Sequence, residues 1–335
     1  MRSGQSEMTS GSEQQPSLRD FLLERRADSP GLASVIQSIA DASKRLARSI
    51  RGAGLSNILG SRGKVNVQGE VTQILDELAT DCFVDALRGN EHVAGLACEE
   101  LDDCEIFPGD GADRYLCVFD PIDGSSNIDV ATSIGSIFGL YAIDGKEVTE
   151  ASFLRTGRDQ IAALYIVYGS STQLVLATTE GVNIFTLHPA KDDFILTSPN
   201  VRIPAASPYY SVNEANAGAW DAAVQTAVAG FRKTCSLRYI GTLVADFHRG
   251  LLKGGIFLYP SDQHNPKGKL RLLYEANPLA FVAEAAGGAA SSGTQRILDV
   301  APASIHERVP LFIGNTDLVM EIENAQAKGA GLVTS

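Results

Sequence analysis

The sequence predicts an α/β fold of the layered α+β kind, in which two lobes of sheets are sandwiched by helices. Apolar residues at helical spacing alternate along the chain with short apolar runs that are typical of strands. A chain of 335 residues with 44% hydrophobic content can bury two lobes. The Pro- and Ser-rich stretch at residues 193–208 marks the expected boundary. We therefore expect a disordered arm over residues 1–16 and lobes over residues 17–198 and 199–335.

Two helices joined by a Gly-rich loop are expected first. The first helix begins with Ser29 as its N-cap and Pro30 in its first turn, and it ends at Gly52. Its apolar residues at helical spacing are Leu32, Val35, Ile36, Ile39, Leu46 and Ile50. The second helix ends at Gly89, and its expected apolar face comprises Val71, Ile74, Leu75, Leu78, Cys82, Phe83 and Leu87.

Strands dominate the next part of the chain. Six short apolar runs predict strands over residues 93–98, 115–119, 133–143, 161–169, 173–179 and 182–187. Beyond the boundary, the pattern predicts helices around residues 214–230 and 241–253, strands over 254–260 and 269–275, and a helix over 277–288. This interleaving of helices and strands is what the fold class rests on.

Charge and cysteine content narrow the function classes. The chain has 28 Lys and Arg against 40 Asp and Glu, a net charge of −12, which disfavours nucleic acids and anionic membranes as partners. No apolar run approaches the roughly 20 residues that span a bilayer. Five cysteines without CxxC spacing predict reduced thiols. A cytoplasmic location is expected, and a plastid location after removal of a transit peptide is the alternative.

The most informative segment is FDPIDGSSN at residues 119–127. An expected strand leads into Asp120 and Asp123, and Gly124 then allows close approach of a ligand to the backbone. If Ser125 and Ser126 open a helical turn, their N–H groups form a phosphate cradle. For this motif alone, a helix cap at Asp123 would be the simpler interpretation.

Other carboxylates stand in similar contexts. Glu99 and Glu100 follow one expected strand, and Glu275 ends another, so all three are expected near Asp120 at the sheet edge. Clustered carboxylates repel one another unless cations neutralise them. A set of oxygen ligands without His or Cys suits Mg²⁺ or Mn²⁺ rather than zinc.

Cationic and phenolic side chains gather in the second half of the chain. Individually, each is more often an ordinary surface residue. As a group they indicate a second phosphate pocket and hence a bisphosphate ligand. The group comprises Arg238, Tyr239, Tyr259, Lys269 and Arg271.

The chain resembles the class I fructose-1,6-bisphosphatases from about residue 17 to about residue 320. The segments that carry the resemblance are FDPIDGSSNID, SIGSIFGLY, ILTSPNVRIP, YSVNEAN, RYIGTLVADFHRGLLKGGIFLYP, GKLRLLYEANPLAFVAEAAGG and RVPLFIGN. Inositol phosphatases share the DPxDGS element, whereas the C-terminal segments are specific to this family. The resemblance implies a sugar-phosphatase fold, usually in a homotetramer. It also implies hydrolysis of the 1-phosphate of fructose 1,6-bisphosphate with two or more Mg²⁺ or Mn²⁺ ions.

The resemblance also implies residue roles. The metal ligands would be Glu99, Glu100, Asp120, Asp123, Glu275 and the carbonyl of Ile122. The 1-phosphate would be held by Gly124, Ser125 and Ser126 beside Asp123, and the catalytic acids would be Glu70, Asp76 and Glu100. The 6-phosphate pocket would comprise Asn213, Tyr239, Tyr259 and Lys269, with Arg238 reaching in from a neighbouring subunit.

Some positions depart from the family pattern. Glu70 stands where animal members have Asp, and Asn216 replaces a phosphate-binding tyrosine. The AMP site of animal members contains an arginine, and Ala142 occupies the corresponding position in this chain, so AMP inhibition is not expected. The regulatory Cys insertion of chloroplast enzymes is absent, so thioredoxin control is not expected. Two alternatives are a sedoheptulose-1,7-bisphosphatase, or an enzyme with both activities, and a non-catalytic sugar-phosphate sensor.

Overall fold

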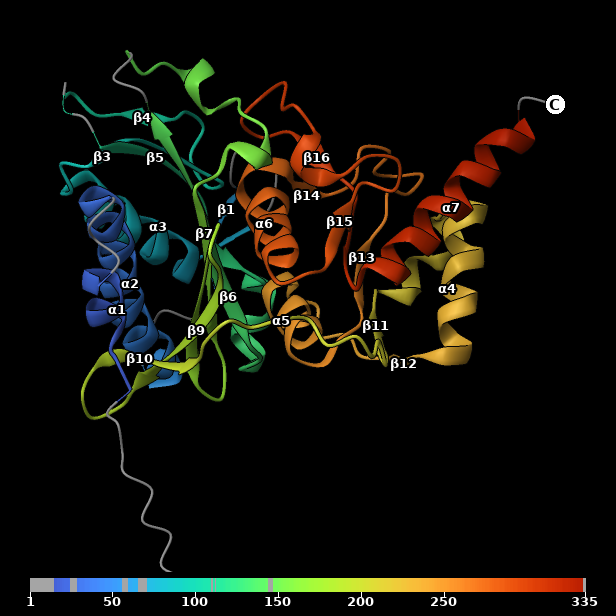
Figure 1. Ribbon diagram of the computed structural model, residues 1–335, viewed down its shortest axis with the longest axis horizontal. Coiled ribbons are helices and arrows are strands. Elements are labelled where there is room, and N and C mark those ends of the chain that lie inside the picture. Colours follow the sequence, from blue (N-terminus) through green and yellow to red (C-terminus); the bar gives the residue numbers. More distant parts are fainter. Residues whose placement is uncertain are drawn as a thin grey trace, which may run out of the picture.

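The computed structural model describes residues 15–24, 29–55, 60–65, 71–109, 111, 113–143 and 147–333. Of the expected disordered arm, residues 1–14 lie outside these ranges. The described residues form alternating layers of helices and sheets, in the order helix, sheet, helix, sheet, helix (Figure 1). The predicted layered α/β fold is therefore confirmed. No helix in the described part is long and apolar enough to cross a membrane.

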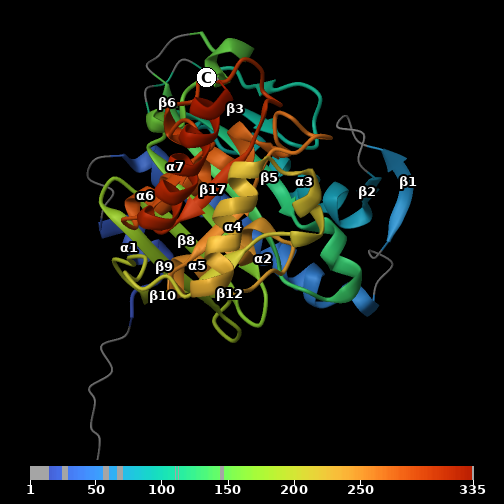
Figure 2. The ribbon, with the colours of Figure 1, turned by 90° about the vertical axis from the view of Figure 1, so that its right-hand side faces the viewer.

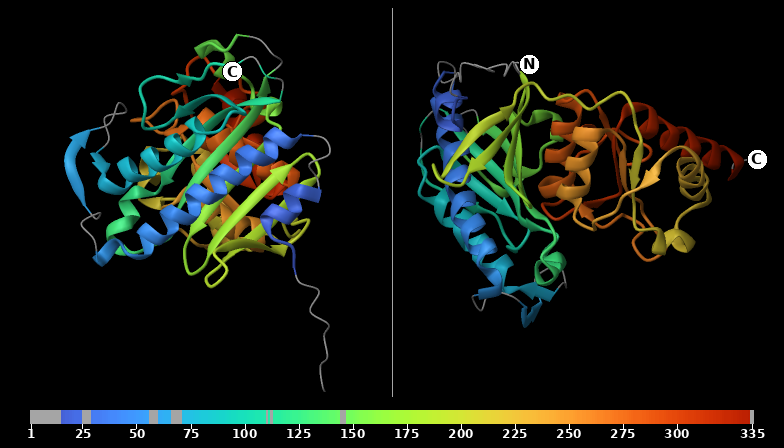
Figure 3. Two further views of the ribbon diagram at one scale, coloured as in Figure 1. Left: turned by 90° about the vertical axis from the view of Figure 1, so that its left-hand side faces the viewer. Right: turned by 90° about the horizontal axis from the view of Figure 1, so that it is seen from below.

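The first layer contains three helices, which lie across one face of the larger sheet (Figure 3, left). They are α1 (Leu18–Glu24), α2 (Pro30–Arg51) and α3 (Ile74–Arg88). Helix α2 has the predicted bounds, with Pro30 in its first turn and Gly52 as its C-cap. Two expectations for α3 are wrong. Val71 lies in the short strand β2 (Val71–Gln73), which pairs with β1 (Ser61–Val65) inside the expected loop, and Leu78 is 37% exposed.

The larger sheet has eight strands in the order β10-β9-β8-β7-β6-β5-β3-β4. The strands are β3 (Val93–Cys98), β4 (Glu105–Ile106), β5 (Arg114–Asp123), β6 (Ile134–Ile143), β7 (Ala162–Tyr168), β8 (Thr172–Thr178), β9 (Gly181–His188) and β10 (Asp193–Ser198). Strands β3 and β5 are parallel, and the N–H of Glu99 donates to the carbonyl of Phe119 at 3.1 Å. Glu99 directly follows β3 and Asp120 lies near the end of β5, so both lie at the carboxyl ends of these parallel strands, as predicted.

The middle helices come from the second half of the chain. Helices α5 (Leu243–Lys253) and α6 (Asn277–Ala285) pack between the eight-stranded sheet and a five-stranded sheet. The smaller sheet has the order β12-β11-β13-β17-β15. Its strands are β11 (Tyr209–Ser211), β12 (Ser236–Leu237), β13 (Ile256–Tyr259), β15 (Ala289–Ser291) and β17 (Leu311–Gly314). The two halves lie side by side when the molecule is viewed from below (Figure 3, right).

The outermost layer consists of α4 (Ala222–Thr234) and α7 (Thr316–Val333), which cover the far face of the smaller sheet (Figure 2). The single helix expected around residues 214–230 is interrupted. A 3₁₀-helix, η5 (Glu214–Ala219), ends at the extended residue Trp220. Asp221 then caps α4 by accepting from the N–H of Val224 at 2.8 Å.

The strand expected over residues 269–275 is largely wrong. Strand β14 covers only Leu270–Arg271, and it pairs with β16 (Arg308–Val309). The next five residues form a π-helical turn, η6 (Leu272–Ala276), which runs into α6. The Glu275 carboxylate accepts from the N–H of Arg271 at 2.5 Å, and Pro278 suits the first turn of α6. Glu275 therefore lies on a helical turn rather than at a strand end.

Short 3₁₀-helices complete the described structure. They are η1 (Ala53–Leu55), η2 (Ser125–Val130), η3 (Glu150–Phe153), η4 (Gly157–Asp159) and η7 (Ile297–Asp299). Of these, η2 directly follows β5 and carries the serines of the FDPIDGSSN segment. The predicted helical turn after Gly124 is therefore confirmed.

Candidate active site

One cavity of about 470 Å³ lies at the edge of the eight-stranded sheet, where β3 and β5 end. Both halves of the chain contribute to its wall. Of the predicted site residues, it is lined by Glu99, Glu100, Asp120, Ile122, Asp123, Gly124, Ser125, Ser126, Tyr239, Tyr259, Lys269, Arg271 and Glu275. The fold thus brings together segments that are up to 202 positions apart in sequence, from Gln73 to Glu275.

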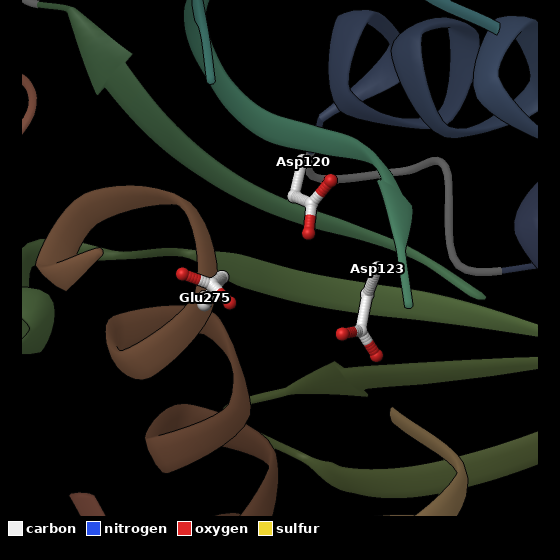
Figure 4. A group of neighbouring side chains, drawn as sticks. All are labelled: Asp120, Asp123 and Glu275. Atoms are coloured by element: carbon white, nitrogen blue, oxygen red, sulfur yellow. The ribbon is translucent and has the colours of Figure 1, made fainter. Parts of the chain in front are cut away.

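Three buried carboxylates face one another in this cavity (Figure 4). Asp120 and Asp123 come from the end of β5, and Glu275 comes from the π-helical turn η6. Each offers a carboxylate oxygen, and these oxygens lie within 4.8 Å of one another. The side chains are well buried, with Asp120 only 2% exposed. Such a set of oxygen donors has the composition and spacing that suit a hard divalent cation.

The electrostatics of the cluster also favour a bound cation. Burial, followed by the neighbouring Glu275 carboxylate, raises the pKa of Glu99. Burial, together with Glu99 and Glu275, raises the pKa of Asp120 well above its usual range. These carboxylates destabilise one another's charged forms, and a divalent cation would relieve that repulsion. The residues present therefore fit a magnesium-type centre.

Asp123 is held by the other half of the chain. Its carboxylate accepts from the N–H groups of Leu243 at 3.3 Å and Val244 at 2.6 Å, at the N-terminus of α5. Burial raises the pKa of Asp123, while these two backbone donors oppose the shift. The positive end of the α5 dipole thus points at a carboxylate of the cluster.

Gly124 shapes the turn that follows. Its φ of +83° is left-handed, and a Cβ there would lie 2.4 Å from Oγ1 of Thr242. The first hydrogen bond of η2 runs from the N–H of Asn127 to the carbonyl of Gly124. The N–H groups of Ser125 and Ser126 come before this first helical bond in the sequence. Both residues line the cavity, where such N–H groups suit an anionic oxygen.

The second half also supplies cations and phenols. Arg271 is 7% exposed, and its Nη2 lies 2.9 Å from Oε1 of Glu99. Lys269 is exposed on the same wall, beside Tyr239 and Tyr259. The cavity therefore has an acidic end at Asp120 and a cationic end at Lys269, which suits a ligand with two anionic groups.

Three predicted site residues of the described part are not on this wall. Asp76 is buried in the first turn of α3, where its carboxylate accepts from the N–H of Gln73 at 2.8 Å, and Gln73 itself lines the cavity. Asn213 and Arg238 are exposed and do not appear among the described lining residues. Glu70 lies outside the described residues.

Sequence reasoning missed several contributors to the site. The missed lining residues are Gln73, Gly241, Leu243, Phe257 and Leu270. The N-terminus of α5 as the partner of Asp123 was also missed, because backbone donors carry no residue signature. A signal was present in the segment YIGTLVAD, where Gly241 precedes an N-cap threonine and Asp246 follows four residues after that threonine.

Comparisons with known proteins agree with this geometry. Residues 17–199 match the family described as "Fructose-1-6-bisphosphatase, N-terminal domain", and residues 203–327 match "Fructose-1-6-bisphosphatase, C-terminal domain". "Fructose-1,6-bisphosphatase class 1" of Sulfurihydrogenibium sp. (strain YO3AOP1) is 46% identical over 304 residues, which are 89% of this chain and 93% of that protein.

A solved structure supports the same assignment. The crystal structure of Leishmania major fructose-1,6-bisphosphatase in holo form has a TM-score of 0.89 and 35% identity. The match covers 93% of this chain and 99% of that one. The chain therefore belongs to the class I fructose-1,6-bisphosphatase family, and it is a phosphoric monoester hydrolase of carbohydrate metabolism that hydrolyses fructose 1,6-bisphosphate.

Proposed function

We propose that the cavity around Asp120 is where this enzyme removes the 1-phosphate of fructose 1,6-bisphosphate, and that Mg²⁺ is its cofactor. The observation that carries the proposal is the cluster of three buried carboxylates whose oxygens lie within 4.8 Å, beside the Gly124 turn. A phosphate ester and its metal ions fit together between these two features.

Two or more Mg²⁺ ions, or Mn²⁺ in their place, would be held by Asp120, Asp123, Glu275, Glu99, Glu100 and the carbonyl of Ile122. When bound, such ions polarise phosphate oxygens, lower the pKa of water and stabilise the leaving oxygen. The role of the protein is to hold the carboxylates deprotonated and correctly spaced. Arg271 and the α5 N-terminus contribute here by stabilising the charged forms of Glu99 and Asp123.

The 1-phosphate binds at the η2 turn in this proposal. The N–H groups of Ser125 and Ser126 and the serine hydroxyls donate to its oxygens, and Gly124 allows the approach. Glu100 lines the cavity and is the candidate to accept the proton of the attacking water. Asp76 and Glu70 are assigned to the same proton transfers. The Asp76 carboxylate reaches the cavity wall through its hydrogen bond from the N–H of Gln73.

The second phosphate binds at the cationic end. We assign this phosphate to Tyr239, Tyr259, Lys269 and Arg271, which line the cavity. We also assign it to Asn213, which is the N-cap of η5. Arg238 is exposed, and its guanidinium lies 5.4 Å from the ring centre of Tyr209. We assign it to the active site of a neighbouring subunit in a homotetramer. The lobes assigned at the outset, with a boundary between residues 198 and 199, are part of this proposal.

A cytoplasmic location also belongs to the proposal. All five cysteines are free thiols in the structure, which is typical of proteins from reducing compartments.

Phosphate release from fructose 1,6-bisphosphate, measured with and without excess chelator, tests the metal requirement. We expect turnover to be lost in metal-stripped enzyme and restored by Mg²⁺. Full turnover in the presence of chelator would contradict the proposal. The same assay with sedoheptulose 1,7-bisphosphate measures whether the pocket also accepts the longer sugar.

A further inference from the structure

The loop that carries Tyr239 into the cavity is held by a carboxylate outside the cavity. This loop, residues 238–242, joins β12 to α5. Both carboxylate oxygens of Asp246 accept from the N–H of Ile240 at 3.0 Å, and Oδ2 also accepts from the N–H of Gly241 at 3.0 Å. The Asp246 side chain is 0% exposed, so no solvent competes for these bonds.

The position of Tyr239 depends on this part of the backbone. Gly241 has a left-handed φ of +86°, a conformation that glycine adopts without steric cost and that other residues rarely adopt. A Cβ built on Gly241 would lie 3.6 Å from the Tyr239 ring, so the ring rests against this residue. Tyr239 is 40% exposed and has open space on its cavity side, so the 240–241 backbone fixes where its hydroxyl points.

The same carboxylate is rigidly attached to the metal end of the site. Asp246 lies in the first turn of α5, and its own N–H donates to the carbonyl of the N-cap Thr242 at 3.0 Å. Oγ1 of Thr242 donates to the carbonyl of Ser133 at 2.9 Å, which ties the helix start to the first half of the chain. The next N–H groups of α5 hold Asp123.

We propose that Asp246 is a positioning residue that fixes Tyr239 relative to the metal carboxylates and thereby sets the preference of the enzyme for a substrate with a second phosphate. This inference rests on the proposed function, which assigns Tyr239 to the 6-phosphate. Asp246 itself touches no substrate, so its effect on binding passes through the loop. Oδ1 of Asp246 also forms an ion pair with Arg249 at 3.3 Å, a contact that involves no atom of the loop.

The test compares two substrates, fructose 1,6-bisphosphate and fructose 1-phosphate, in the Asp246→Asn variant. Asn has the same shape, but its NH₂ group cannot accept a backbone N–H. We expect kcat/KM for the bisphosphate to fall about tenfold, mostly through KM, because charge-assisted hydrogen bonds are lost. For fructose 1-phosphate we expect a change of less than about twofold. Equal losses on both substrates would overturn the inference, as would no loss on either.

A double-mutant cycle with Tyr239→Phe identifies the route of the effect. In the Tyr239→Phe background, Asp246→Asn should lower kcat/KM for the bisphosphate by less than about twofold. A full tenfold loss there would overturn the inference while leaving the proposed function in place. If Tyr239→Phe alone does not change the ratio of the two substrates, the assignment of the 6-phosphate pocket is wrong.

Three further variants separate positioning from folding. Gly241→Ala disturbs the loop through its φ alone, since the added methyl meets no atom closer than 3.6 Å, and it should reproduce the substrate pattern of Asp246→Asn. Arg249→Met removes the ion pair but none of the loop contacts, and should leave the substrate ratio unchanged. Asp221→Asn makes the same change at the N-cap of α4, a residue that does not line the cavity, and should also leave the ratio unchanged. A loss of bisphosphate preference in either control would overturn the inference.

Discussion

Lys269 and Arg271 are two residues apart on one short segment, yet they carry their charges into different surroundings. Arg271 is buried against Glu99, so its charge stabilises a carboxylate of the metal cluster. Lys269 is exposed on the same wall. It directly precedes β14, whose second residue is Arg271, and both residues line the cavity. Arg271 therefore supports the metal cluster, whereas Lys269 is the cation that we expect to contact the ligand.

Lys269→Ala should raise KM for fructose 1,6-bisphosphate by about tenfold or more and lower kcat much less. The lysine contacts the phosphate that does not react, so its binding energy is shared by the ground and transition states. Steady-state kinetics measure both constants. Lys267→Ala is the matched control, because Lys267 is exposed on the same loop but does not line the cavity. An unchanged KM in Lys269→Ala would remove Lys269 from the pocket.

His248 shows how a residue of α5 can be structural although it lies near the site. Its Nδ1 accepts from the Tyr165 hydroxyl at 2.8 Å, and its Nε2 donates to Oε1 of Gln173 at 2.9 Å. Both ring nitrogens are thus satisfied in the neutral form. Burial lowers the pKa of His248 from 6.5 to about 4. These contacts are those of a structural residue.

This depressed pKa predicts a loss of stability in acid. Between pH 6.5 and 4 the unfolded chain binds a proton at His248 that the folded chain does not, so the stabilisation present above pH 6.5 is lost as the pH falls. The slope for one such group is about 1.4 kcal/mol per pH unit. Thermal midpoints measured from pH 7.5 to 4.5 should fall less steeply in His248→Gln. The exposed His188, changed to Gln, should leave the slope unaltered, and parallel curves for both variants would contradict the prediction.

At the scale of elements, the N-terminus of α2 is already capped by an anion of the chain itself. Asp113 has a left-handed φ of +65°, and its carboxylate accepts from the N–H of Gly31 at 2.6 Å and contacts the Tyr115 hydroxyl. The neighbouring Arg114 is 5% exposed. Its guanidinium donates to the carbonyls of Val93, Phe107, Pro108 and Gly109. The N–H of Gly31 and the Arg114 guanidinium already donate to partners within the chain, so neither is free to bind an external phosphate.

AMP should therefore inhibit this enzyme poorly. The Asp113 carboxylate would repel a nucleotide phosphate at α2, and Ala142 provides no charge where animal members have an arginine. One lost charged contact typically weakens binding by about ten- to a hundredfold. Initial rates titrated with AMP at saturating Mg²⁺ measure this. Half-inhibition at low micromolar AMP would show that control by AMP survives.

The elements also show what sequence patterns can and cannot predict. Helix α2 was predictable because its cap, its apolar spacing and its terminal glycine all agree. The carboxylates at the ends of β3 and β5 were predictable because parallel strands share an edge. The turn at Glu275 was not, because Leu272 and Leu273 are buried on all sides and an apolar run of this kind has no period that separates strand from helix. The hold of α5 on Asp123 was not predictable either, since the contacts of backbone N–H groups depend on the tertiary arrangement.

At the scale of the whole molecule, the two halves share one continuous interior. Ile137 and Ala163 of the larger sheet belong to the same apolar cluster as Leu243 and Val244 of α5. The middle helices therefore complete the core of the first half while they carry the second half of the active site. The exposed Arg238, at the end of β12, projects from this unit rather than into its own cavity.

The proposed tetramer predicts that Arg238→Ala raises KM for fructose 1,6-bisphosphate several-fold while each isolated subunit fold stays intact. Analytical ultracentrifugation measures the assembly, and steady-state kinetics measure KM. Arg202→Ala is a suitable control, since Arg202 is exposed and donates to the carbonyl of Ala285 in its own subunit at 3.0 Å. A monomeric enzyme with full activity would rule out a contribution from a neighbouring subunit.

The contact between the α5 N-terminus and Asp123 also limits how this chain can be recombined with its relatives. A hybrid joined between Ser198 and Tyr209 would inherit Asp120 and Asp123 from one parent and Glu275, with the start of α5, from the other. The acidity of Asp123 would then be set by a helix that did not evolve with it, even if every carboxylate were retained. A functional hybrid therefore requires that the segment from Asp120 to Asn127 and the segment from Tyr239 to Asp246 come from the same parent.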